Sequence, residues 1–229
     1  MQDVSAVYKR LLKDKNHRKE SKIEIAGTTF GIDKLISLRT YGGLYVGSAS
    51  IGKTASRQID VSLFAGDATI PKMAEIKVFV RLVTKNEVSE WIPKGVFYIY
   101  TREFDKDTGV LTIHGYDAML KAEQVFLTET TEDDWPQPMV DVVDEIAEVM
   151  GVPIDPRTNL DSRLLTPYPL DYTMREILGY VAIANGGNWI ITDAGYLRLV
   201  GLADDPGDTN YLVDEYGNTI LFGNTRILV

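Results

Sequence analysis

The sequence predicts a mainly β, antiparallel fold followed by a small α+β module. From about Lys22 to Tyr116, apolar residues recur at every second position, which is typical of half-buried strands. Turn residues separate these runs and no helical periodicity interrupts them, which favours an antiparallel barrel or sandwich. After residue 138 the apolar residues follow the period of a helix. We therefore expect two folded parts of different character.

Residues 1–22 are predicted to form an N-terminal amphipathic helix and a basic segment. The apolar positions lie at i, i+3, i+4, i+7 and i+8 and share one helix face: Val4, Val7, Tyr8, Leu11 and Leu12. This face must dock on the chain's own barrel or on a neighbouring subunit. The basic residues that follow are expected to form a solvated helix end, where cations suit the helix dipole: Lys13, Lys15, Arg18, Lys19 and Lys22.

Residues 23–126 are predicted to form an antiparallel β-barrel. Runs such as 59–63 and 76–82 alternate apolar and polar residues, and 96–100 is dense in aromatic and β-branched residues. The turn sequence Asp105-Lys106-Asp107-Thr108-Gly109 joins two such runs, so we expect a hairpin there.

Residues 127–138 are acidic and contain two prolines, so we expect a linker. Residues 139–201 then predict the α+β module. A helix over 142–150 should end at Gly151, and a capping box from Thr173 to Glu176 should begin a second helix that stops at 185–187. A hairpin should follow, with strands over 188–192 and 196–200.

Residues 202–229 are expected to begin a further β region, with strands over 220–222 and 226–229. Because the chain stops on an apolar strand residue, we expect this region to be truncated.

The composition argues against several functions. The chain has 0 Cys and 2 His, which excludes disulfides and thiol nucleophiles and leaves too few ligands for a His-rich metal site. A formal net charge of -9 disfavours nucleic acid as a partner. The sequence has no apolar run long enough for a membrane helix, and its first residues lack the pattern of a secretory signal, so we expect none. We therefore expect no cofactor, no metal, no nucleic acid and no membrane insertion.

One segment matches the nucleotide-binding P-loop expression G-x-x-x-x-G-K-[ST] through Gly47, Gly52, Lys53 and Thr54. A P-loop needs a buried parallel strand before it and a helix after it. Here the following residues alternate like a strand, so we judge the match fortuitous. Nucleotide binding remains an alternative hypothesis.

Two acidic segments offer weaker candidates. The Asp105–Gly109 segment is similar to the start of a calcium loop, but Tyr116 stands where the closing acid is needed, which favours a plain hairpin turn. The carboxylates of the linker could act in acid–base chemistry, although a solvated loop would leave their pKa values unraised. These carboxylates are Glu129, Glu132, Asp133 and Asp134.

His114 could belong to a Ser-His-Asp arrangement with a nearby Asp117, but the sequence has no G-x-S-x-G element. We therefore favour a packed or interface histidine. The segment Trp91–Gly95 with Tyr98 and Tyr100 could form a sugar-stacking platform, although strand aromatics are more often core or interface residues. A carbohydrate-binding module that docks the bacterial surface remains a second alternative.

A series of segments together resembles the tail and baseplate hub proteins of phages and prophages of Gram-positive bacteria. The resemblance runs from about Val7 to Val229. It is carried by residues 50–52, 55–61, 70–74, 88–97, 111–120, 174–182, 187–189 and 195–197.

The resemblance implies a tail-tube-like β-barrel, then a small α/β domain, then a second barrel. It implies a structural and non-enzymatic subunit, assembled as a homotrimer ring between the tail tube and a spike or fibre. The tail tube, tape-measure and spike or fibre proteins would be its partners. The protein would be located in the virion tail after assembly in the bacterial cytoplasm. No catalytic residue is carried over from the family.

Overall fold

The computed structural model describes residues 4–42, 50–66, 69–128 and 130–201, and the backbone of 221–222 and 225–226. Residues Val4–Leu202 form one compact unit, and residues 1–3 with 203–229 are assigned to another. Within the described residues, no helix combines the length and the apolar character that crossing a membrane requires.

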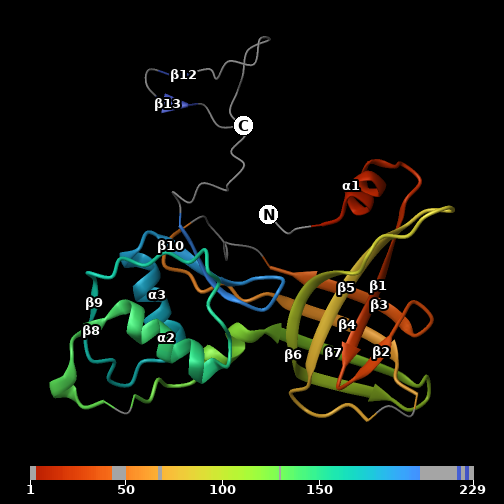
Figure 1. Cartoon of the computed structure of the whole chain (residues 1–229). Coiled ribbons are helices and arrows are strands. Elements are labelled where there is room, and N and C mark those ends of the chain that lie inside the picture. The colour runs from red at the N-terminus through yellow and green to blue at the C-terminus, as the bar shows by residue number, and fades with distance from the viewer. Residues whose placement is uncertain are drawn as a thin grey trace. The chain divides into compact units, whose positions relative to one another are not determined.

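The first part of the larger unit is a seven-stranded antiparallel sheet that curls into a half-barrel (Figure 1). The strand order is β2-β1-β5-β6-β7-β4-β3, so β2 and β3 are its two edges. The predicted β-rich fold is confirmed, and the expected barrel is a half-barrel. The strands are β1 (Arg18–Ile25), β2 (Thr28–Phe30), β3 (Leu35–Tyr41), β4 (Gln58–Phe64), β5 (Glu75–Val83), β6 (Ile92–Asp105) and β7 (Val110–Asp117).

The predicted alternation sets the inner face of this sheet. In β4 the buried residues are Ile59, Val61 and Leu63, with partly exposed residues between them. The neighbouring strands add their own buried positions to one continuous core, which includes Ile23, Ile25, Phe30, Ile76, Val78, Phe97, Ile99, Leu111 and Ile113. Each such side chain contributes about 1.5–3 kcal/mol through burial.

The predicted hairpin between β6 and β7 is confirmed. The ladder runs to the pair Asp105↔Val110, and the turn between them contains Gly109 at φ +69°. The Asp105 carboxylate accepts hydrogen bonds from the backbone N–H of Asp107 (2.9 Å) and from the hydroxyl of Thr108 (2.7 Å). These bonds lower the pKa of Asp105. The Asp105 carboxylate therefore stabilises the turn in which it lies.

The N-terminal helix is confirmed as α1 (Ala6–Lys13), capped by the Ser5 hydroxyl. It packs against β5, and its buried residue is Leu11. The Glu90 carboxylate accepts hydrogen bonds from both the backbone N–H and the hydroxyl of Ser5, and Arg10 pairs with Glu87.

The expected basic helix end is wrong for Arg18, Lys19 and Lys22, which lie on β1. This strand pairs with β5 from Arg18↔Val83 to Ile25↔Ile76. The polar side chains of β1 have interaction partners on the same strand and on β5. For example, the Lys22 ammonium lies 4.7 Å from the ring centre of Phe79 and 2.7 Å from a carboxylate oxygen of Glu24.

The second part of the unit is the predicted α+β module. Its elements are η1 (Ala118–Glu123), η2 (Glu132–Asp134), β8 (Gln137–Pro138), α2 (Met139–Met150), β9 (Leu165–Thr166), α3 (Met174–Ala184), β10 (Gly187–Ile191) and β11 (Leu197–Gly201). Gly151 ends α2 in the left-handed conformation, and Thr173 with Glu176 forms the predicted capping box of α3. Strands β10 and β11 pair as the predicted hairpin.

A second hydrophobic core lies inside this module, around Trp189 and the inner faces of α2 and α3. Residues from the 118–126 segment contribute to it, namely Ala118, Met119, Ala122 and Phe126. In the acidic segment, Trp135 packs partly against the same core, and β8 pairs with β9. Residues after 117 therefore pack with the module.

In the C-terminal region, β12 (Leu221–Phe222) and β13 (Thr225–Arg226) form an antiparallel pair. The other residues of the two predicted strands, 220 and 227–229, lie outside the described residues.

Candidate functional site at the junction of the two cores

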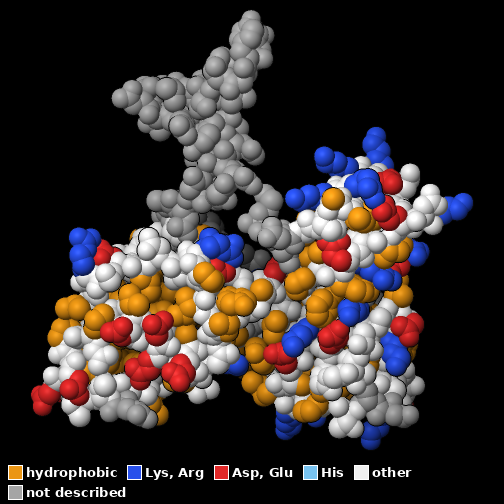
Figure 2. Space-filling view, viewed as in Figure 1, with side chains coloured by type: hydrophobic (Ala, Val, Ile, Leu, Met, Phe, Trp, Pro, Cys, Tyr) orange, Lys and Arg blue, Asp and Glu red, His pale blue; other side chains and the backbone are white. Residues whose placement is uncertain are grey.

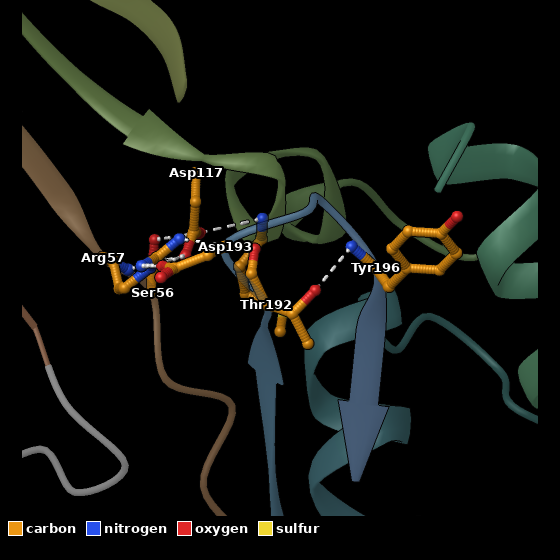
Figure 3. Close-up of polar contacts among 7 residues, drawn as sticks. Ser56, Arg57, Asp117, Thr192, Asp193 and Tyr196 are labelled. Carbon is orange, nitrogen blue, oxygen red and sulfur yellow. Dashed lines mark hydrogen bonds and ion pairs between the residues drawn. The ribbon is translucent and has the colours of Figure 1, made fainter. Parts of the chain in front are cut away.

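Asp117 ends β7 and caps η1, and its side chain is fully buried. One carboxylate oxygen accepts hydrogen bonds from the Ser56 hydroxyl (3.0 Å) and the backbone N–H of Met119 (3.1 Å). The other accepts from the backbone N–H of Arg57 (2.8 Å), as Figure 3 shows. Burial raises the pKa of Asp117, against the opposing effect of these hydrogen bonds and of the Arg57 charge. This carboxylate therefore ties the segment before β4 to the start of η1.

Arg57 extends this network to the module (Figure 3). Its guanidinium donates a hydrogen bond to the Asp193 carboxylate, in the turn between β10 and β11. The Lys94 ammonium lies 3.5 Å from the other oxygen of Asp193, and the ring of Phe97 lies 5.4 Å from the guanidinium carbon. Two cations of the half-barrel thus hold one carboxylate of the module. Such charge-assisted bonds are about twice as strong as neutral ones.

The described part of the P-loop look-alike lies at the same junction. Trp189 in β10 donates its backbone N–H to Lys53 (2.8 Å), and Ala55 donates to Trp189 (2.9 Å). The Lys53 N–H donates to the Asn188 side chain (2.8 Å). Residues 53–55 thus run beside β10, and β4 begins at Gln58. A phosphate-binding loop would instead lead into a helix.

Gly52 has a packing role in this segment. Its φ is +79°, and a Cβ built there would lie 2.3 Å from Cγ1 of Ile183 on α3. Only a residue without a side chain allows this approach. Gly47, the other glycine of the motif, lies outside the described residues.

A cavity of about 400 Å³ borders the junction and is lined by residues of both parts, including Tyr100, Tyr116, Glu123 and Arg175. The two tyrosine rings meet edge to face with centres 5.4 Å apart, and Arg175 pairs with Glu123 at 2.9 Å. Of the predicted sugar platform, only Tyr100 lies here. The Trp91 ring is elsewhere, with the guanidinium of Arg81 4.4 Å from its centre.

His114 lies on β7, and its Nδ1 is 2.7 Å from a carboxylate oxygen of Asp60 on β4. Its ring also meets Tyr116 edge to face at 4.9 Å. The structure therefore pairs His114 with Asp60 and does not bring it together with Asp117.

The acidic segment before α2 forms local structure. The Asp134 carboxylate accepts hydrogen bonds from the backbone N–H and the hydroxyl of Thr131 (2.9 and 2.8 Å), which lowers its pKa. Glu132 and Asp133 are exposed, and Glu129 lies outside the described residues. In the described part of the chain, no three His, Asp or Glu side chains are grouped so that they could hold a metal ion.

Sequence reasoning did not identify the junction residues Arg57, Asp117 and Asp193 as a site. The sequence did contain one indication that Asp117 is buried. The inward positions of β7 are Leu111, Ile113, Gly115 and Asp117, so the alternation itself places an acid on the buried face. A buried acid requires a positively charged or hydrogen-bonding partner. The long-range partners of Asp117, however, are Ser56 and Arg57, which lie 61 and 60 residues away in sequence.

No family model and no curated protein matches the sequence. The structure is similar to the solved 43 kDa tail protein of prophage MuSo2 from Shewanella oneidensis, with 12% identity and a TM-score of 0.51. That match covers 81% of this chain and 56% of the tail protein. The tail protein from Neisseria meningitidis MC58 is also similar, with 12% identity and a TM-score of 0.55, over 88% of this chain and 58% of that protein.

This chain thus spans little more than half the length of either tail protein. At 12% identity the likeness shows the fold. The half-barrel with its attached module is therefore a fold that this chain has in common with two solved tail proteins.

Proposed function

We propose that the chain is a structural subunit of a phage or prophage tail, and that it belongs to the baseplate hub of a phage of Gram-positive bacteria. The observation that carries this proposal is the fold, which matches two tail proteins over 81% and 88% of this chain. The sequence segments that resemble hub proteins support the same function independently of the fold.

The half-barrel offers a means of assembly. Strands β2 and β3 are the two edges of the sheet, and an edge strand presents backbone N–H and C=O groups that a neighbouring copy can pair with. A closed ring of copies satisfies every such edge without leaving a free one. We propose a homotrimer ring between the tail tube and a spike or fibre, with the tape-measure protein as a further partner.

The junction fits a role in holding the half-barrel and the module together within a ring. A ring subunit must keep its two parts in a fixed arrangement when neighbouring proteins exert force on them. The buried Asp117 and the Arg57–Asp193 ion pair supply directional bonds between the parts. Hydrogen bonds and ion pairs of this kind have a defined geometry, so they favour one arrangement of the two parts over others.

The test has two measurements. The purified chain should form a species of three subunits by light scattering, seen as a ring with three-fold symmetry by negative-stain electron microscopy. An antibody against the chain should label the distal end of tails in particles assembled in the bacterial cytoplasm. A chain that is absent from purified tails would contradict the tail function, whereas a labelled tail with a monomeric purified chain would contradict only the ring.

A further inference from the structure

The charges of the larger unit are distributed unevenly between α1 and α2. Residues 5–19 contain six Lys or Arg and one acid, whereas residues 122–156 contain ten Asp or Glu and no Lys or Arg. Figure 2 shows blue side chains gathered over α1 and red ones over α2. A chain with a net charge of -9 thus carries a strongly basic surface, which is well placed to meet an acidic surface on another molecule.

The outward face of α1 has a defined pattern. Leu12 is 52% exposed although it is a large apolar residue, and it lies between the exposed lysines Lys9 and Lys13. Because these lysines are four residues apart, they project from the same side of the helix. Neither has an acidic group within ion-pair distance in the part of the chain that the structure describes, whereas Arg10 is paired with Glu87.

A shallow groove of about 460 Å³ lies beside the C-terminal half of α2. Its apolar floor includes Ala147, Val152 and Ile154, and the acids Asp144 and Glu148 line it. These two acids are also four residues apart, so they repeat the spacing of Lys9 and Lys13. Across the residues described, neither acid has a basic side chain within ion-pair distance.

The end of α2 also attracts cations. The last carbonyl groups of a helix carry partial negative charge. In this chain the Lys121 ammonium already donates a hydrogen bond of 2.8 Å to the Met150 carbonyl at that helix end. Because Lys121 already takes up this partial charge, an ammonium from another molecule would be attracted by the two carboxylates, Asp144 and Glu148.

We propose that α1 of one copy docks in the α2 groove of a second copy, with Leu12 on the apolar floor and Lys9 and Lys13 against Asp144 and Glu148. The two surfaces differ, so the contact is head-to-tail, which is the kind that generates a ring when the rotation closes. This inference rests on the proposed ring assembly and adds, beside the strand edges, a second pair of surfaces through which neighbouring copies would meet.

Charge reversal tests the contact on the full chain by sedimentation velocity. Either Lys9→Glu with Lys13→Glu, or Asp144→Lys with Glu148→Lys, should weaken self-association about 10-fold or more, because like charges would face each other. The chain with all four changes should regain association, since the pairs are exchanged. The control Lys72→Glu with Lys106→Glu reverses two exposed lysines outside both surfaces and should leave association unchanged. Circular dichroism would verify that each variant is folded.

Disulfide trapping gives an independent readout, because the chain has 0 Cys. Untagged Leu12→Cys mixed with tagged Ile154→Cys should give a mixed disulfide dimer under mild oxidation, which can form only between two copies. Tagged Lys106→Cys in place of Ile154→Cys should not. If the chain associates but the reversals have no effect and no mixed disulfide forms, the α1–α2 contact is wrong while ring assembly stands. If the chain is monomeric at all concentrations and no mixed disulfide forms, both are wrong.

Discussion

Removing the Asp117 carboxylate would leave the Ser56 hydroxyl and two backbone N–H groups without their acceptor, and the Arg57 charge without one of its partners. We expect Asp117→Ala to lower the free energy of unfolding by about 3 kcal/mol, the cost typical of breaking a buried charged network. Urea unfolding would measure it. The control Asp107→Ala, in the exposed β6–β7 turn, should change stability by less than about 0.5 kcal/mol. Equal effects would contradict the role given to Asp117.

A second residue links stability to pH. Two nitrogen atoms of Arg157 donate hydrogen bonds of 2.8 and 2.6 Å to the Asp155 carboxylate, and this lowers the pKa of Asp155 to about 2. A lowered pKa stabilises the fold above the unfolded value near 4, and the stabilisation is lost as the pH falls towards 2. The stability advantage of the wild type over Asp155→Asn should therefore shrink by about 1–2 kcal/mol between pH 5 and pH 2.5. A constant difference in urea unfolding free energy would refute this.

At the scale of an element, the segment before β4 docks on the module through Gly52. Gly52→Ala should destabilise the chain by about 1–3 kcal/mol more than Gly109→Ala does. Both glycines have positive φ, +79° and +69°, so the backbone strain is matched. A Cβ at Gly109 meets nothing within 4 Å, whereas one at Gly52 meets Ile183. Urea unfolding of the two variants gives the comparison, and equal losses would mean that strain alone acts at Gly52.

Elements governed by local sequence could be predicted, and elements governed by distant partners could not. The alternation in β4, the β6–β7 turn and the Thr173 cap depend on neighbours within a few residues. The start of β1 escaped prediction because Arg18–Lys22 is polar and reads as a solvated segment. Its strand form comes from pairing with β5, about 60 residues further along the chain.

The candidate site likewise contains one feature set by local sequence and others set by distant partners. The alternation of buried and exposed residues in β7 places Asp117 on the inner face. Only the folded chain shows that Arg57 and Asp193, which are 136 residues apart, meet beside it. The P-loop look-alike is the opposite case. Its local sequence pattern matches in full, but its described residues contact β10 and α3, which are distant in sequence.

At the scale of the whole larger unit, the junction should make the half-barrel and the module unfold together. Each has its own core, and the Arg57–Asp193 pair with the residue 53–55 pairing on β10 joins them. Trp91 reports on the half-barrel and Trp189 on the module core. Each probe is followed in a variant of the chain that lacks the other two tryptophans. With the Arg57–Asp193 pair intact, we expect both probes to report the same urea transition.

Arg57→Ala should separate the two transitions, because it removes the ion pair between the cores while both cores keep their apolar residues. A double-mutant cycle with Asp193→Ala should give a coupling energy of about 1–2 kcal/mol, within the range for contacting charged residues. The matched control is Arg163→Ala, whose partner Asp161 lies two residues away within the module. It should leave both probes coincident. If Arg57→Ala also left them coincident and the cycle gave no coupling, the Arg57–Asp193 pair would not be what fixes the module on the half-barrel.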